Sequence, residues 1–288
     1  LLNRLLAWWL TATEESPTLH LAGLELAKPL ETGVMVRVYA ASRLYQFPMG
    51  VLAVSLGVAV FPLLSRYASR GDMANLRESL NRALRLTLME GLAAGTALFL
   101  LAEPACVLIF QRGDFGPADA AAAAHVLRMY VLGMWAYCSY QIFTRAFYSL
   151  KDIKTPLVVS CVLVVPNLAM VAALVWVPQL GAGAFGLAAA VTFAASTIIQ
   201  GLLLRRRVGP FGGGRLVASL GRSLLACTAM AGAILACRWA LGPEASAAAV
   251  LGACIPVGAV AFFAAALALR APEPGEFLRA VRKRKAAD

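Results

Sequence analysis

The sequence predicts an all-α fold, a polytopic transmembrane helical bundle with seven complete spans that follow the stump of one further helix. Hydrophobic residues make up 60% of the chain and charged residues only 14%, which is typical of a membrane protein and not of a soluble domain. The apolar residues fall into long runs, and the basic residues gather in every second connection between those runs. Together these features predict helices that cross a bilayer repeatedly.

The first predicted span contains the run 44–64, which has no charged side chain. At about 1.5 Å per residue it is long enough to cross a bilayer core of about 30 Å. Arg43 directly precedes this run, and a helix that begins near Val34 places Arg43 inside the membrane. A guanidinium there is costly unless it faces protein, water or an anion, so Arg43 is a candidate functional residue. The alternative is that it snorkels to the headgroups.

Six further apolar runs complete the predicted bundle, at residues 86–102, 120–147, 156–180, 181–204, 216–241 and 245–269. Glu90, His125 and Arg128 interrupt the second and third spans. Arg128 is a second candidate for contacting a substrate, and Glu90 is expected to pair with an arginine of a neighbouring helix. Arg145 is expected to anchor the third span at its cytoplasmic end.

The predicted organisation has four parts. Residues 1–13 are a remnant of a preceding transmembrane helix, because the apolar opening LLNRLLAWWL is too short to span. Residues 14–33 form a periplasmic loop with turn signals, residues 34–269 the seven-helix membrane domain, and residues 270–288 a basic cytoplasmic tail. The stump indicates the C-terminal portion of a larger protein.

The charge distribution predicts the orientation. Basic side chains cluster at residues 66–85, 151–154, 205–215 and 270–285, whereas the alternate connections hold only Lys28 and Arg112. By the positive-inside rule, the clusters and the C-terminus are cytoplasmic. The alternating distribution of the +11 net charge therefore indicates a multi-pass membrane protein and not a nucleic-acid partner.

Several function classes are disfavoured. The sequence contains no HExxH, P-loop, GxSxG or paired-carboxylate motif, and its six cysteines lie in apolar sequence without a CxxC pair. We therefore expect neither an enzyme nor a bound cofactor. The glycines of the GLAAG segment at residues 91–95 are expected to serve close helix packing.

Three motifs carry a resemblance to a known family. They are ASRLYQFPMGVLAVSLGVAVFPLLSRYASRGD at residues 41–72, AEPACVLIFQRGDFGPAD at 102–119 and RAFYSLKDIKTPLVVS at 145–160. In this order they resemble the lipid II flippases of bacterial cell-wall synthesis, the MurJ/MviN family. The resemblance implies a fold of fourteen transmembrane helices in two lobes, of which this chain holds the end of helix seven and helices eight to fourteen.

The resemblance also implies a mechanism. The family moves lipid II, a lipid-linked peptidoglycan precursor with a diphosphate, across the cytoplasmic membrane. Arg43 matches the family's cavity arginine and is predicted to bind the diphosphate with its planar fork, with Arg128 as a further contact. Ser42 departs from the family, which usually has Asp there. Transport is expected to require the N-terminal lobe as well as surrounding membrane lipids.

Some family members resemble sodium-coupled transporters, and their ion ligands match Asn3, Asn167 and Thr192 here. Val171 stands where the family often has a polar residue, so the predicted sodium site is short of oxygen ligands. The alternative is that Asn167, beside Pro166, bonds backbone groups freed at a helix kink.

Two other functions stay open from the sequence. One is export of another lipid-linked oligosaccharide, or of a drug, by a relative in the same superfamily. The other is a truncated, noncatalytic membrane scaffold.

Overall fold

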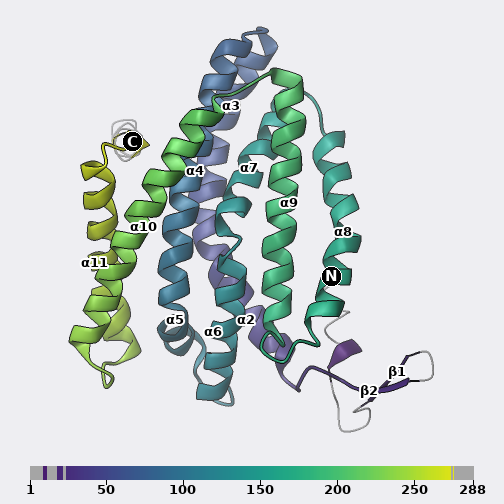
Figure 1. Cartoon of the computed structure of the whole chain (residues 1–288), viewed down its shortest axis with the longest axis vertical. Helices are drawn as coiled ribbons and strands as arrows, with labels where there is room; N and C mark the ends of the chain where they lie inside the picture. The colour runs from purple at the N-terminus through teal and green to yellow at the C-terminus, as the bar shows by residue number, and fades with distance from the viewer. Residues whose placement is uncertain (1–8, 12–17, 22–23, 274, 276–288) are drawn as a thin grey trace.

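The computed structural model describes residues 9–11, 18–21, 24–273 and 275. The fold is an all-helical membrane bundle, as predicted, with one small hairpin outside it (Figure 1). Its helical elements are α2 (Val34–Met49), the π-helix η1 (Gly50–Val54), α3 (Ser55–Ser69), α4 (Met73–Leu100), α5 (Ala102–Phe110), α6 (Pro117–Val131), α7 (Met134–Ser149), α8 (Lys154–Leu174), α9 (Gly183–Val208), α10 (Gly213–Leu241) and α11 (Ala247–Ala268).

The hairpin lies within the predicted outer loop. Strands β1 (Thr18–Leu21) and β2 (Leu24–Ala27) pair antiparallel, with Thr18 opposite Ala27. The sequence predicts turns in this loop but no strands. A two-stranded ribbon is marginal by itself, so neighbouring structure is needed to hold it.

Among the described residues, five helices are long and apolar enough to cross a membrane, namely α4, α8, α9, α10 and α11. The other two predicted spans are each divided. The first consists of α2, η1 and α3, and the third of α6 and α7 with a break at Leu132 and Gly133. The count of seven spans stays a prediction.

The division of the first span has a local cause. Pro48 lies in the last turn of α2, where it lacks an N–H and its ring crowds the carbonyl one turn earlier. The chain widens into η1 immediately afterwards, which is the kind of local adjustment that a proline inside a helix produces.

Helix α4 is longer than the second predicted span, since it begins at Met73 and not near residue 86. Asp72 caps it by accepting a hydrogen bond from the Asn75 backbone N–H at 3.1 Å. The polar first half of α4 also holds the connection between α9 and α10. Asn81 donates to the carbonyls of Phe211 at 2.7 Å and Gly212 at 3.0 Å.

The connections sort cleanly between the two ends of the bundle. Figure 1 shows the α3–α4, α7–α8 and α9–α10 connections at the upper end, where α11 also finishes. The α5–α6, α8–α9 and α10–α11 connections lie at the lower end with the hairpin. The clusters of basic residues at 66–85, 151–154 and 205–215 therefore share one end of the molecule.

Small residues allow the central helices to approach closely. A Cβ atom on Gly91 would lie 2.9 Å from the Trp135 Cα, and one on Gly95 would lie 3.1 Å from the Val131 carbonyl oxygen. The GLAAG segment thus serves helix packing between α4 and the α6–α7 region, as predicted.

Candidate functional site

Arg43 lies on the exposed side of α2, one helical turn after Tyr39. The buried residues of this helix are Val34, Ala40 and Ala41, and α2 packs mainly on α6. The Arg43 Nη2 atom donates to the Tyr39 hydroxyl at 2.6 Å. Within the described part of the chain, Arg43 forms no ion pair with a carboxylate. Its remaining donors are therefore available to an anion.

Ser42 occupies the position where the resemblance predicts an acid. Its hydroxyl donates to the Tyr39 carbonyl at 2.8 Å, a bond back to its own helix. The guanidinium of Arg43 lies 4.8 Å from the centre of the Tyr39 ring. Tyr39 therefore holds the Arg43 side chain in position without neutralising its charge.

Arg37 has a different environment on the same helix. Its Nε atom donates to Asp119 Oδ1 at 2.8 Å, and its Nη1 atom lies 3.2 Å from Glu31 Oε2. Asp119 also accepts from the Gly116 backbone N–H at 3.1 Å. The hydrogen bond from Arg37 is the main reason that the pKa of Asp119 lies below its ordinary value. The charge of Arg37 is thus already compensated at the start of α6.

Arg128 is not brought to Arg43. Its Nη2 atom lies 3.6 Å from Glu103 Oε2 on α5, in a half-exposed ion pair. Two residues later on α6, Tyr130 stacks on Tyr45 of α2 at a ring-centroid distance of 4.8 Å. Positions two apart on a helix point in nearly opposite directions, so the side of α6 that meets α2 carries Tyr130 and not Arg128.

An aromatic cluster, which the sequence alone did not reveal, joins α2, α6, α7 and α9. Tyr137 lies 5.8 Å from Tyr45 and 4.1 Å from Phe193 between ring centroids, and Tyr140 lies 5.6 Å from Phe193. The spacing of Tyr137 and Tyr140, three apart on α7, was the available signal. The cluster packs beside the α6–α7 break and fixes α2, which carries Arg43, against the bundle.

Two of the three predicted sodium ligands are in contact. The Asn167 amide on α8 donates to the Thr192 hydroxyl on α9 at 3.0 Å. Val171, one turn after Asn167, is fully buried between hydrophobic residues. Asn3 lies outside the described residues. The pair offers the Asn167 carbonyl oxygen and the Thr192 hydroxyl, far fewer oxygens than a hard cation takes, so it does not by itself form a complete ion site.

Glu90 lines an apolar groove between α4, α10 and α11. The groove has a volume of about 490 Å³, and its walls include Ala93, Met230, Ile255 and Phe262. The Glu90 Oε2 atom is buried and has no hydrogen-bond partner among the described residues. Within the described part of the chain, the arginine that we expected as the partner of Glu90 is not found.

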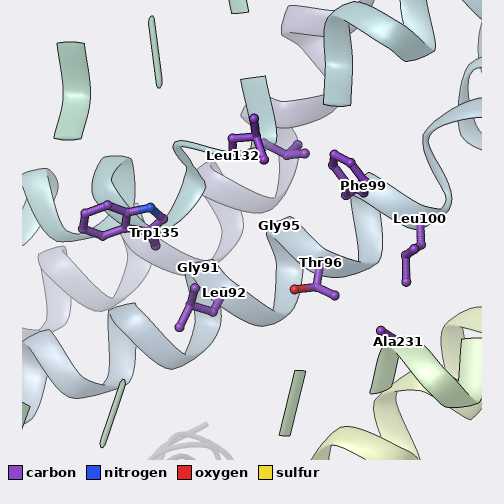
Figure 2. A pocket seen from close by; sticks show the side chains of 10 residues that line it. Gly91, Leu92, Gly95, Thr96, Phe99, Leu100, Leu132, Trp135 and Ala231 are labelled. Carbon is purple, nitrogen blue, oxygen red and sulfur yellow. The ribbon is translucent and has the colours of Figure 1, made fainter. Parts of the chain in front are cut away.

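A smaller pocket of about 270 Å³ lies across α4 from this groove. Figure 2 shows Phe99 and Leu132 at one side of it, and Ala231 of α10 beyond Thr96 and Leu100. Its walls are mostly apolar, and the labelled polar groups are the Thr96 hydroxyl and the Trp135 indole nitrogen. Both spaces fit hydrocarbon better than a polar headgroup.

Arg145 extends across a helix contact towards α3. Its guanidinium fills the space where a side chain on Gly57 would lie, and its Nη1 atom is buried without a hydrogen-bond partner in the described structure. We expected an interfacial anchor at this position. The structure instead shows a guanidinium packed over the backbone of the neighbouring helix, which makes Arg145 a further cation between α3 and α7.

The comparisons with known proteins identify the family. Its model, described as lipid II flippase MurJ, matches residues 18–243. This range includes Arg43, Arg128, Asn167 and Thr192. The chain belongs to the MurJ family. Its members are named as lipid II flippases, which are transporters and not enzymes.

Individual relatives agree. A probable lipid II flippase MurJ of Rhizobium meliloti (strain 1021) is 31% identical over 232 residues, which are 79% of this chain and 42% of that protein. One of Buchnera aphidicola subsp. Acyrthosiphon pisum is 34% identical over 131 residues, 46% of this chain and 26% of that protein. The chain thus spans less than half the length of these MurJ relatives.

A solved structure shares the fold. It is described as lipid II flippase MurJ in an inward closed conformation, and it superposes with a TM-score of 0.65 at 22% identity. The match covers 83% of this chain and 48% of that structure. The helical arrangement seen here therefore corresponds to about half of that solved structure.

Proposed function

We propose that this chain forms the C-terminal lobe of a flippase that moves lipid II across the bacterial cytoplasmic membrane, and that Arg43 contacts the diphosphate. The observation that carries the proposal is the state of Arg43. Its side chain is exposed on α2, donates a hydrogen bond to the Tyr39 hydroxyl, and forms no ion pair with a described carboxylate. A charged group inside an apolar helix is retained at a cost, which binding of an anionic substrate offsets.

The chemistry of the ligand matches this arrangement. A guanidinium keeps its charge and donates two parallel hydrogen bonds to phosphate oxygens. The bond to Tyr39 limits the rotamers of Arg43, so less side-chain entropy is lost when the diphosphate binds. Arg37 and Arg128 each have a carboxylate partner already, so they are poorer candidates for the primary contact.

The apolar groove between α4, α10 and α11 supports a lipid substrate. Its hydrocarbon walls offer a polyprenyl tail a path along the bundle while the headgroup lies on the polar side. A single lobe provides one side of a headgroup cavity, so transport requires a second lobe that alternates against it. Asn167 and Thr192 remain candidate ligands for a coupling sodium ion if that second lobe or the region around Asn3 supplies further oxygens.

The test uses the full-length protein in cells depleted of their own flippase. Arg43→Ala is expected to abolish growth while the protein still inserts, because removing an intramembrane charge does not hinder insertion. Arg43→Lys should restore part of the function, since lysine keeps the charge but not the planar fork. Tyr39→Phe should weaken transport less than Arg43→Ala.

Arg37→Gln is the matched control, because it removes one positive charge from the same helix at a position that already has acidic partners. Growth is scored with protein levels checked by immunoblot. Full growth with Arg43→Ala, or equal loss with Arg37→Gln at normal protein levels, would contradict the diphosphate role.

A further inference from the structure

A cleft between α8 and α9 lies at the end of the bundle that holds the basic connections. It has a volume of about 520 Å³. Its lining combines two chemistries, with charged or polar side chains at the rim and apolar ones below. It shares no lining residue with the groove beside Glu90, and Arg43 is not part of it.

The rim is cationic. Lys154 begins α8, and Arg206 and Arg207 lie in the last turn of α9; all three are exposed. Asp152 is the acid of the cleft, and it forms an ion pair with Arg207. Lys154 and Arg206 form no ion pair within the described part of the chain. The rim therefore has two uncompensated positive charges from two helices.

The position of the rim is fixed by its acid. Asp152 accepts hydrogen bonds from the Thr155 backbone N–H at 3.0 Å and from the Thr155 hydroxyl at 2.7 Å. These bonds, the Thr155 hydroxyl foremost, hold the pKa of Asp152 below its ordinary value. Asp152 therefore stays ionised, and it holds Arg207 beside the first turn of α8.

The lower wall is apolar and continues onto the outer face of α8. Phe147, Val158, Val159 and Leu203 line the cleft. Beyond it, Val162 is 63% and Val165 71% exposed on a helix that packs mainly on α9 and lies at one edge of the bundle (Figure 1). In a bilayer this face contacts acyl chains, so the cleft opens both to the headgroup region and to the hydrocarbon.

We propose that this cleft is a binding site for an anionic glycerophospholipid of the adjoining leaflet. The lipid phosphate lies between Lys154 and Arg206, and one acyl chain follows Val158 towards Val162. Basic pockets between transmembrane helices on the cytoplasmic side bind acidic lipid headgroups because the opposite charges attract. A zwitterionic headgroup lacks the negative net charge that would match the two cations of the rim. The proposal does not depend on lipid II transport, because its readout is binding of a bulk lipid.

The experiment is native mass spectrometry of the purified full-length protein, titrated with phosphatidylglycerol and separately with phosphatidylethanolamine. The wild type should prefer phosphatidylglycerol. The double variant Lys154→Ala/Arg206→Ala should bind it about tenfold more weakly, since each lost cation near the surface removes part of the attraction. The control Arg66→Ala/Arg70→Ala removes the same charge from exposed residues at the end of α3 and should bind as the wild type does.

Two further variants separate a loss of lipid binding from a loss of folding. Lys154→Arg/Arg206→Lys keeps both charges and should retain the preference even if the alanine variant fails to fold. Val158→Trp should fill the apolar part of the cleft and weaken phosphatidylglycerol binding. Glycerol 3-phosphate has the phosphate but no acyl chain, so its ability to compete for the cationic rim should not change. Unchanged phosphatidylglycerol affinity in a folded alanine variant, equal loss in the α3 control, or no effect of Val158→Trp overturns the proposal.

Discussion

Arg43 and Arg128 are arginines in apolar helices with opposite surroundings. Arg128 has an acidic partner in Glu103, whereas the partner of Arg43 among the described residues is Tyr39, through its hydroxyl and its ring. The sequence singles out Arg43 because it directly precedes a run without charge, and Arg128 because it interrupts a predicted span. It does not reveal their partners, because which side of α6 meets α2 depends on packing that the helical period alone does not specify.

Glu90 gives a prediction about stability. Its carboxyl oxygen is buried in an apolar groove without a partner among the described residues, so replacing Glu90 by Leu should stabilise the protein by about 1–3 kcal/mol. Glu90→Gln keeps a buried polar group and should gain less. Thermal unfolding of the detergent-solubilised protein measures the difference. A lower melting temperature for Glu90→Leu would show that the carboxyl has a stabilising partner.

Asp119 gives a prediction about pH. Its pKa is lowered, chiefly by the hydrogen bond from Arg37, so the ionised carboxylate stabilises the folded state at pH values above its ordinary pKa of about 3.9. That contribution is lost as the pH falls through the lowered value. The wild type should therefore be more stable than Asp119→Asn at pH 6, and the difference in stability should shrink as the pH falls below about 3.9. Melting temperatures across this range test it, and a constant gap would contradict it.

At the scale of helices, the sequence predicts where apolar segments lie better than how they are built. Long apolar runs locate α8, α9, α10 and α11 because a bilayer demands continuous apolar length. Apolar length alone predicts neither the π-helix η1 nor the break at Gly133. Pro48 predicts an irregularity in the helix. Whether that irregularity is a kink or a π-helix depends on how α2 and α3 pack against the neighbouring helices.

The crossing of α9 and α6 gives a prediction about packing. A Cβ atom on Gly186 would lie 2.8 Å from the Tyr130 backbone nitrogen and 2.8 Å from the Val126 carbonyl oxygen. Backbone atoms cannot move aside without separating the helices. Gly186→Ala should therefore destabilise the protein by about 1–3 kcal/mol.

Gly252 is the matched control, since it also lies inside a helix but a Cβ atom there would meet no neighbouring helix or side chain within 4 Å. Gly252→Ala should stabilise by about 0.5–1 kcal/mol, because alanine loses less backbone entropy on folding. Melting temperatures in one detergent compare the two variants. A neutral Gly186→Ala would mean that α6 and α9 separate more easily than this contact implies.

For the molecule as a whole, the positions of the basic residues in the sequence predict which connections share one end of the bundle. The basic connections alternate along the chain, and the structure gathers the described ones at one end because each span reverses direction. The family motifs add the second contribution, since the Asn167–Thr192 contact joins residues that no helical period relates. Neither source predicts the hairpin, in which Thr18 pairs with Ala27 and Leu21 with Leu24.

The orientation itself can be tested with two single cysteines. Arg70 ends α3 among the basic connections, and Arg112 lies in the α5–α6 connection at the opposite end; both are exposed. If the basic end is cytoplasmic, a membrane-impermeant maleimide should label Arg112→Cys in spheroplasts and should label Arg70→Cys only after permeabilisation. The six native cysteines, of which Cys161 is exposed, are first replaced by alanine. Labelling of Arg70→Cys in sealed spheroplasts would reverse the orientation, and it would also move the lipid cleft between α8 and α9 to the periplasmic leaflet.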